Sequence, residues 1–188
     1  MAPEEQAYII NHSEASLLVY LPELGEKVAT LQPLLDHAPV CQSTGQMDQL
    51  PAAASTAGND PAGLHTECAI LYTSGSTGKP KGCILTNEYF LLSGRRYVEL
   101  GELCAMEAGC ERLATPLPLV HMNAMACSTL AMILVGGCLI QLDRFHPRSW
   151  WTSVRESRAS IVHYLGVMPA MLLSMDPLEG PGGDDFSS

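Results

Sequence analysis

The sequence LYTSGSTGKPKG, from Leu71 to Gly82, is the most informative stretch of this chain, because it places glycines and hydroxyl side chains between an apolar run and two lysines. Gly75 and Gly78 permit a positive φ, which lets successive backbone N–H groups turn toward one anion. Hydrogen-bond donors and positive charges surround these glycines, supplied by Thr73, Ser74, Ser76, Thr77, Lys79 and Lys81. The stretch therefore predicts a loop that binds a polyphosphate.

Two better-known nucleotide motifs do not fit this loop. A Walker A loop has four residues between its first glycine and Gly-Lys, which Ser or Thr then follows. Here only two residues separate Gly75 from Gly78, and Lys79 precedes Pro80, which disfavours a helix starting there. No Gly-x-Gly-x-x-Gly dinucleotide fingerprint opens a helix either. The simpler alternative is a flexible, solvated Gly/Ser loop, which the two lysines and the proline disfavour.

The stretch closely resembles the signature of the AMP-forming adenylating enzymes, which include acyl-CoA synthetases, firefly luciferase and the adenylation domains of peptide synthetases. The resemblance covers roughly Pro3 to Met175 and continues in three later stretches: TPLPLVHMNA (Thr115 to Ala124), GGCLIQLDRFHP (Gly136 to Pro147) and IVHYLGVMPAMLL (Ile161 to Leu173). It implies an α/β fold, namely a partial N-terminal domain of the adenylating-enzyme fold with a mixed, largely parallel sheet layered with helices.

The resemblance also implies a reaction. In these enzymes a carboxylate attacks the α-phosphate of ATP, with Mg²⁺ assisting, and gives an acyl-adenylate and pyrophosphate. The thiol of coenzyme A then displaces AMP from the acyl-adenylate. Residues Thr73 to Lys81 would hold the β- and γ-phosphates, with Lys81 at the family's regular lysine position and Lys79 at a less strict one. His121, in the second motif, would form a wall or gate of the acyl pocket.

The family's later motifs do not occur in this sequence, including those whose glutamate binds magnesium and whose aspartate holds the ribose. We therefore expect a fragment of an ATP-dependent carboxylic acid:CoA ligase, inactive alone and without a metal site of its own. Crotonobetaine/carnitine-CoA and fatty-acyl-CoA ligases resemble it most. The alternatives are a catalytically dead remnant that binds nucleotide or a partner, and a luciferase-like or amino-acid-adenylating enzyme. No carboxylate follows the second motif to hold a substrate ammonium, which disfavours an amino-acid substrate.

Composition restricts the partners and the location. A formal net charge of −10 and a pI near 4.9 argue against nucleic acid or an anionic membrane, so small molecules are the expected partners. The uncharged run from Met122 to Leu142 is interrupted by Gly136 and Gly137, and it predicts a helix followed by a buried strand, not a membrane span. Seven cysteines without a Cys-x-x-Cys pair favour reduced thiols, and the acidic N-terminus lacks a leader pattern, so we expect a cytoplasmic protein.

Apolar periodicity and turn residues predict alternating helices and strands. We expect strands at 17–20, 68–73, 82–85, 113–115, 138–142 and 160–164. Helices are expected at 4–12, 22–35 and 147–157, after a cap near Thr86 or Asn87, and from Pro169 onward. The resulting divisions are an N-terminal α/β segment at 1–35, a loop or linker at 36–66, an incomplete AMP-binding core at 67–175 and a disordered tail at 176–188.

Overall fold

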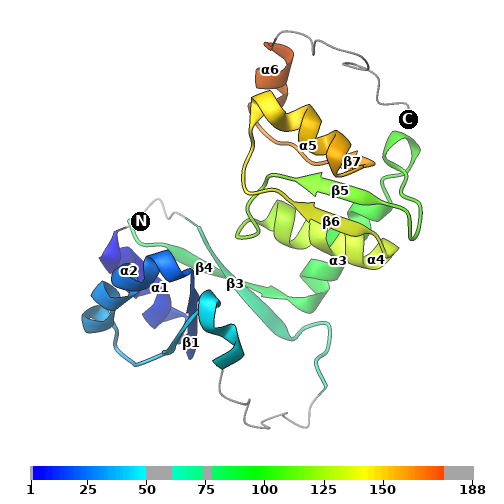
Figure 1. Cartoon of the computed structure of the whole chain (residues 1–188). Helices are drawn as coiled ribbons and strands as arrows, with labels where there is room; N and C mark the ends of the chain where they lie inside the picture. Colours follow the sequence, from blue (N-terminus) through cyan, green and yellow to red (C-terminus); the bar gives the residue numbers. More distant parts are fainter. Residues whose placement is uncertain (1, 50–60, 74–77, 176–188) are drawn as a thin grey trace. The chain divides into compact units, whose positions relative to one another are not determined.

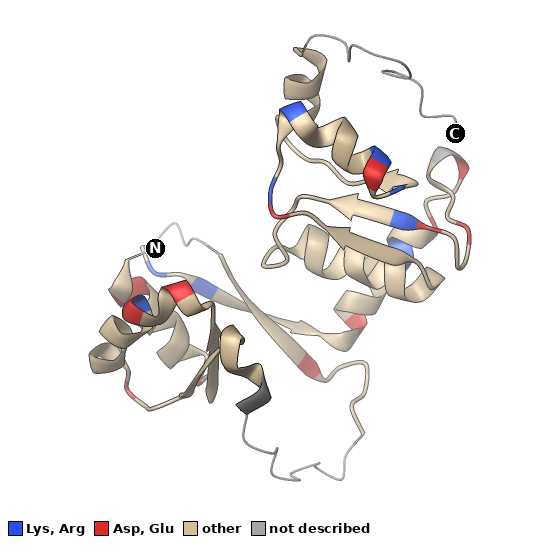
Figure 2. Ribbon diagram, viewed as in Figure 1, with Lys and Arg blue, Asp and Glu red and all other residues tan. Residues whose placement is uncertain are grey.

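The computed structural model describes residues 2–49, 61–73 and 78–175 of the chain. The chain divides into two units, Met1–Leu85 and Thr86–Ser188. Figure 1 labels the helices and strands of both, Figure 2 colours their basic and acidic residues, and each unit is described by itself.

The first unit begins with two short helices and a pair of parallel strands. Its elements are α1 (Pro3–His12), β1 (Leu17–Tyr20), η1 (Pro22–Leu24), α2 (Gly25–Leu31), η2 (Gln32–Leu34), β2 (Val40–Ser43) and η3 (Thr44–Gln49). Prolines occupy early positions of α1 and η1, where a missing N–H costs nothing. Ala7 and Ile10 of α1 and Val28 and Leu31 of α2 are buried, so these faces form the apolar centre of this part.

Two longer strands follow in the same unit. β3 (Glu67–Thr73) and β4 (Lys81–Thr86) pair with each other, and they flank the stretch that we predicted to bind phosphate. Their pairing brings the two ends of that stretch together.

The second unit is a parallel sheet covered by helices. Its elements are α3 (Asn87–Val98), η4 (Glu102–Cys104), β5 (Arg112–Thr115), the π-helix η5 (Asn123–Ser128), α4 (Thr129–Val135), β6 (Cys138–Gln141), η6 (Pro147–Ser149), α5 (Trp150–Glu156), β7 (Ile161–Val162) and α6 (Met168–Leu173). The strand order is β6-β5-β7, and both pairings are parallel. The side chain of Thr86 accepts a hydrogen bond from the backbone N–H of Tyr89 and caps α3, as the sequence predicted.

The central strand β5 is covered on both faces. Leu113 packs with Ala131, Met132 and Val135 of α4, whereas Trp150, Val154 and Met168 form a second cluster from α5 and α6. Figure 1 shows α3 and α4 on one side of this sheet and α5 on the other. Burial of β5 on both faces explains the apolar Leu113 and Ala114 at its centre.

Several expectations from the sequence need correction. Residues 36–66 were expected to form a loop or linker, but they contain strand β2. This strand pairs with β1 along its whole length. The helix expected at 22–35 is divided into η1, α2 and η2, and the strand expected at 160–164 is limited to β7. The tail at 176–188 and residues 50–60 lie outside the described residues.

The run from Met122 to Leu142 forms η5, α4 and β6, separated at Gly136, whose φ of 69° ends the helix. In the part of the chain that the structure describes, no helix is both long and apolar enough to cross a membrane.

Candidate functional site

The predicted phosphate loop connects the end of β3 to the start of β4. Ser74, Gly75, Ser76 and Thr77 lie outside the described residues. Thr73 ends β3 and Lys81 begins β4, and both are exposed, as is Lys79. Their hydroxyl and ammonium groups can therefore reach a ligand in solvent.

Gly78 is one of two glycines in this stretch whose role the structure explains. Its φ of 97° lies in the left-handed region, which a side chain would strain, although the space around it is open. Glycine is therefore the residue that adopts this conformation without strain directly ahead of Lys79.

Gly82 is required for a different reason. A Cβ atom at Gly82 would lie 2.9 Å from Ile70 Cγ2 and 3.2 Å from Tyr72 Cζ. The glycine thus makes room for the Tyr72 ring across the β3–β4 pair. The sequence contains both residues but gives no sign of this contact.

His121 lies in the second unit, on the segment that leaves the carboxyl end of β5. It is exposed, its backbone N–H donates to Pro118 O at 3.0 Å, and its carbonyl accepts from Met125 N at 3.0 Å. η5 begins two residues later at Asn123. Ligands of open α/β sheets bind at the carboxyl ends of the strands, so this position suits the predicted pocket wall.

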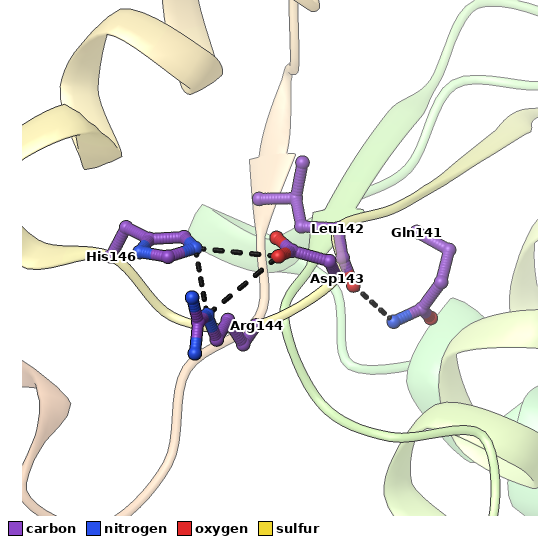
Figure 3. A network of polar contacts seen from close by, with 5 residues as sticks. All are labelled: Gln141, Leu142, Asp143, Arg144 and His146. Atoms are coloured by element: carbon purple, nitrogen blue, oxygen red, sulfur yellow. Dashed lines mark hydrogen bonds and ion pairs between the residues drawn. The ribbon is translucent and has the colours of Figure 1, made fainter. Parts of the chain in front are cut away.

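Hydrogen bonds hold the neighbouring strand ends together. Gln141 Nε2 donates to Leu117 O at 3.0 Å and to Leu142 O at 2.8 Å, which ties the end of β6 to the segment after β5. Figure 3 shows the contacts that follow along the chain. Asp143 lies 3.4 Å from His146 Nε2 and 3.7 Å from Arg144 Nε. A hydrogen bond from His146, together with Arg144, lowers the pKa of Asp143.

A partly buried polar cluster is formed by Tyr97 of α3, Ser128 at the end of η5 and His163 directly after β7. Ser128 is 0% exposed, and its Oγ lies 2.6 Å from His163 Nδ1 and 3.2 Å from Asn123 O. The Tyr97 hydroxyl lies 3.3 Å from His163 Nε2. Because Ser128 has one proton to give and Asn123 O can only accept, Nδ1 of a neutral ring carries the hydrogen. Tyr97 then donates to His163, His163 to Ser128, and Ser128 to Asn123 O.

This cluster is uncharged at neutral pH. Burial lowers the pKa of His163 and raises the pKa of Tyr97, and it also raises the pKa of the adjacent Cys127 thiol. A cavity of about 520 Å³ borders the cluster, with Tyr97, Leu113, His163 and Tyr164 in its lining. The cluster links α3, η5 and the end of β7, and η5 carries the residues that follow His121.

Sequence reasoning missed the cluster. His163 stands in an apolar, strand-like run, and Ser128 lies 35 residues earlier. Nothing local in either segment marks the other as its partner.

The cluster predicts how the stability of the second unit depends on pH. Since the folded pKa of His163 lies below its unfolded value of about 6.5, the folded chain binds fewer protons than the unfolded chain as pH falls through that range. Stability from neutral His163 is therefore present above pH ~6.5 and is lost as pH falls toward the folded pKa. We expect the free energy of unfolding of His163→Gln to depend less on pH than that of the wild type. Urea titrations between pH 7.5 and 5, followed by the fluorescence of Trp150 and Trp151, measure the free energy of unfolding at each pH. The same dependence on pH in the wild type and in His163→Gln would contradict the prediction.

The structure brings together only part of the predicted site. Thr73, Lys79 and Lys81 share the first unit with the β3–β4 pair, whereas His121 belongs to the second unit. Among residues 2–49, 61–73 and 78–175, no group of three or more His, Cys, Asp or Glu side chains could hold a metal ion.

Comparisons with known proteins support the family resemblance that the sequence shows. The family model for AMP-binding enzymes matches residues 1–188. The feruloyl-CoA synthase of an Amycolatopsis species is 31% identical over 163 residues, which are 84% of this chain and 30% of that enzyme. The crotonobetaine/carnitine–CoA ligase of Citrobacter koseri is 26% identical over 185 residues, 90% of this chain and 35% of that ligase.

A solved structure supports the fold. The N-terminal domain of FACL13 from Mycobacterium tuberculosis superposes with a TM-score of 0.73 and 20% identity, over 93% of this chain and 44% of that one. The predicted fold class and the resemblance to acyl-CoA ligases are confirmed. The chain spans about a third of the length of the curated relatives that it matches. By the match along its whole length, the chain belongs to the AMP-binding enzyme family.

Proposed function

We propose that this chain carries the ATP phosphate-binding loop and part of the acyl pocket of an AMP-forming carboxylic acid:CoA ligase. The observation that supports it most is the arrangement of the loop ends. β3 ends at Thr73 and its neighbour β4 begins at Lys81, and Lys79 directly follows Gly78, whose φ is in the left-handed region. Two exposed ammonium groups on one short turn favour a ligand with several negative charges.

In this proposal each residue has a separate task. Lys81 stabilises the charge that develops on the leaving pyrophosphate, and Lys79 adds a second positive charge. The hydroxyl of Thr73 donates to a phosphate oxygen. Mg²⁺, when bound with ATP, neutralises further phosphate charge. The described residues include no carboxylate cluster for the ion, so we assign it no ligand here.

His121 is proposed to form part of the wall of the acyl pocket. It is exposed at the carboxyl end of β5, directly ahead of η5. Met122 and Asn123 follow it and bring no negative charge to this segment, which disfavours a substrate with an ammonium group. We therefore infer a carboxylic acid without an amino group as the substrate, with coenzyme A as the acceptor.

The proposal predicts what this chain binds by itself. A site that contacts only phosphates should bind ATP and tripolyphosphate with affinities within about tenfold of each other. It should bind AMP at least about tenfold more weakly. We expect no acyl-adenylate from the chain alone. Isothermal titration with each ligand, in the presence of Mg²⁺, measures the affinities. Equal affinities for AMP and ATP, or no binding of tripolyphosphate, would contradict a phosphate-binding site in this chain.

A further inference from the structure

Helix α1 contacts β3 directly ahead of the loop. The hydroxyl of Tyr72, which precedes Thr73, lies 2.7 Å from His12 Nδ1 and 3.4 Å from Ile9 O. The Tyr72 and His12 rings meet edge to face, with their centroids 5.6 Å apart. Burial raises the pKa of Tyr72, so its hydroxyl keeps its proton at neutral pH.

The same helix contacts the other end of the loop. Lys79 Nζ lies 5.4 Å from the centroid of the Tyr8 ring, a distance at which an ammonium is attracted to an aromatic face. The Tyr8 ring in turn lies 5.4 Å from the His12 ring. A continuous row of contacts thus runs from Lys79 through Tyr8 and His12 to Tyr72.

The arrangement uses two faces of α1. Ala7 and Ile10 are buried at 3% and 8% exposure and belong to the apolar centre of the unit. Tyr8 and His12 are four residues apart, so they lie one above the other on a helix. A helix fixed by one face therefore offers a rigid support on the other.

Tyr72 connects this support to the strands. Its ring lies against Gly82 of β4, where a Cβ atom would approach Tyr72 Cζ to 3.2 Å, while its hydroxyl reaches α1. Movement of α1 would therefore be transmitted to both strands that carry the loop.

We propose that Tyr8, His12 and Tyr72 form an aromatic clasp that positions Thr73 and Lys79 for binding polyphosphate. This inference rests on the proposed function of the loop. The clasp residues do not touch the ligand. They fix the backbone on either side of the loop and the place of the Lys79 ammonium, which reduces the ordering that binding would otherwise require.

Four variants separate the contacts of the clasp. Tyr8→Ala removes the aromatic face beneath Lys79, whereas Tyr8→Phe keeps it. Tyr72→Phe removes the hydroxyl and keeps the ring against Gly82. Tyr89→Phe is the matched control, because Tyr89 lies on α3 in the other unit.

The first measurement needs no ligand. Ring-current shifts of the Lys79 methylene protons and the exchange rates of the Thr73 and Lys79 amides report the clasp by NMR. We expect Tyr8→Ala to abolish the upfield shift and both Tyr8→Ala and Tyr72→Phe to speed exchange at these amides. Tyr8→Phe and Tyr89→Phe should resemble the wild type. Unchanged exchange in Tyr8→Ala and Tyr72→Phe would overturn the clasp while leaving the loop's function intact.

The second measurement is the affinity for tripolyphosphate. An exposed cation–π contact corresponds to about a two- to fivefold change in affinity, so Tyr8→Ala should bind about two- to fivefold more weakly and Tyr8→Phe like the wild type. Faster exchange with unchanged or tighter tripolyphosphate binding would overturn the positioning role. Absence of tripolyphosphate binding in the wild type, with the exchange differences present, would instead refute the function proposed for the loop and the positioning role with it.

Discussion

Gly94→Ala is expected to destabilise the second unit by about 2 kcal/mol. A Cβ atom at Gly94 would lie 2.5 Å from Leu130 Cβ, 2.8 Å from the Leu130 carbonyl carbon and 3.0 Å from Ala131 N. Two of these are backbone atoms, so no side-chain rotation relieves the clash and α3 must separate from α4. Overpacking of this kind costs about 3 kcal/mol at its upper end, and the better helix propensity of alanine offsets about 1 kcal/mol.

The measurement is selective for this unit, because both tryptophans of the chain, Trp150 and Trp151, lie in α5. Urea unfolding followed by tryptophan fluorescence should show a lower midpoint for Gly94→Ala. Arg95→Ala is the matched control, since Arg95 is the next residue of α3 and is exposed. We expect its free energy of unfolding to stay within about 0.5 kcal/mol of the wild type. Equal effects of the two substitutions would refute the close contact of α3 with α4.

The same substitution connects packing to the polar cluster. Tyr97 lies one turn after Gly94 on α3 and donates to His163, which in turn contacts Ser128. A displaced α3 would withdraw Tyr97 from His163. We therefore expect the pH dependence of stability described for His163 to be altered in Gly94→Ala.

Local signals in the sequence predicted much of the fold. Strands β5 and β6 were predicted because each has apolar residues at its centre, Leu113 and Ala114 in β5 and Leu139 and Ile140 in β6. The cap at Thr86 and the helix stop at Gly136 were found because each depends on one residue's own chemistry.

The remaining features depend on contacts between distant residues. β2 has the sequence VCQS, which carries no clear strand pattern, and it becomes a strand through its pairing with β1. The π-helix η5 reads as an ordinary helix, although Ser128 Oγ and Thr129 Oγ1 bond to carbonyl groups five residues earlier. The clasp on α1 joins residues 60 positions apart, such as His12 and Tyr72. The periodicity of apolar residues along the sequence cannot reveal contacts between residues so far apart.

The composition of the phosphate loop was readable from sequence, whereas its support was not. Gly78 and the two lysines form the recognisable pattern, and Gly78 has the positive φ that a turn requires. The reason for Gly82 became clear only with the Tyr72 ring beside it. The roles of Thr73, Lys79 and Lys81 remain predictions that binding measurements must decide.

Lys81→Ala is expected to weaken tripolyphosphate binding by about 10- to 100-fold. A hydrogen bond to a charged group contributes about 1.5–3 kcal/mol, and the lost positive charge has no replacement at the start of β4. Lys79→Ala should have a smaller effect, because Lys79 occupies the less strict of the two lysine positions in the family's motif.

Lys27→Ala separates this local effect from a change in net charge. Lys27 is the only cation before Lys79, and it lies on α2 in the same unit. Both substitutions change the formal charge of the chain from −10 by the same single unit. If Lys81 acts through direct contact, Lys27→Ala should bind tripolyphosphate within about twofold of the wild type, and Lys81→Arg should recover part of the lost affinity. Equal losses in Lys27→Ala and Lys81→Ala would mean that the loop attracts phosphate only through the field of the whole unit, because two lysines at different places would then be interchangeable.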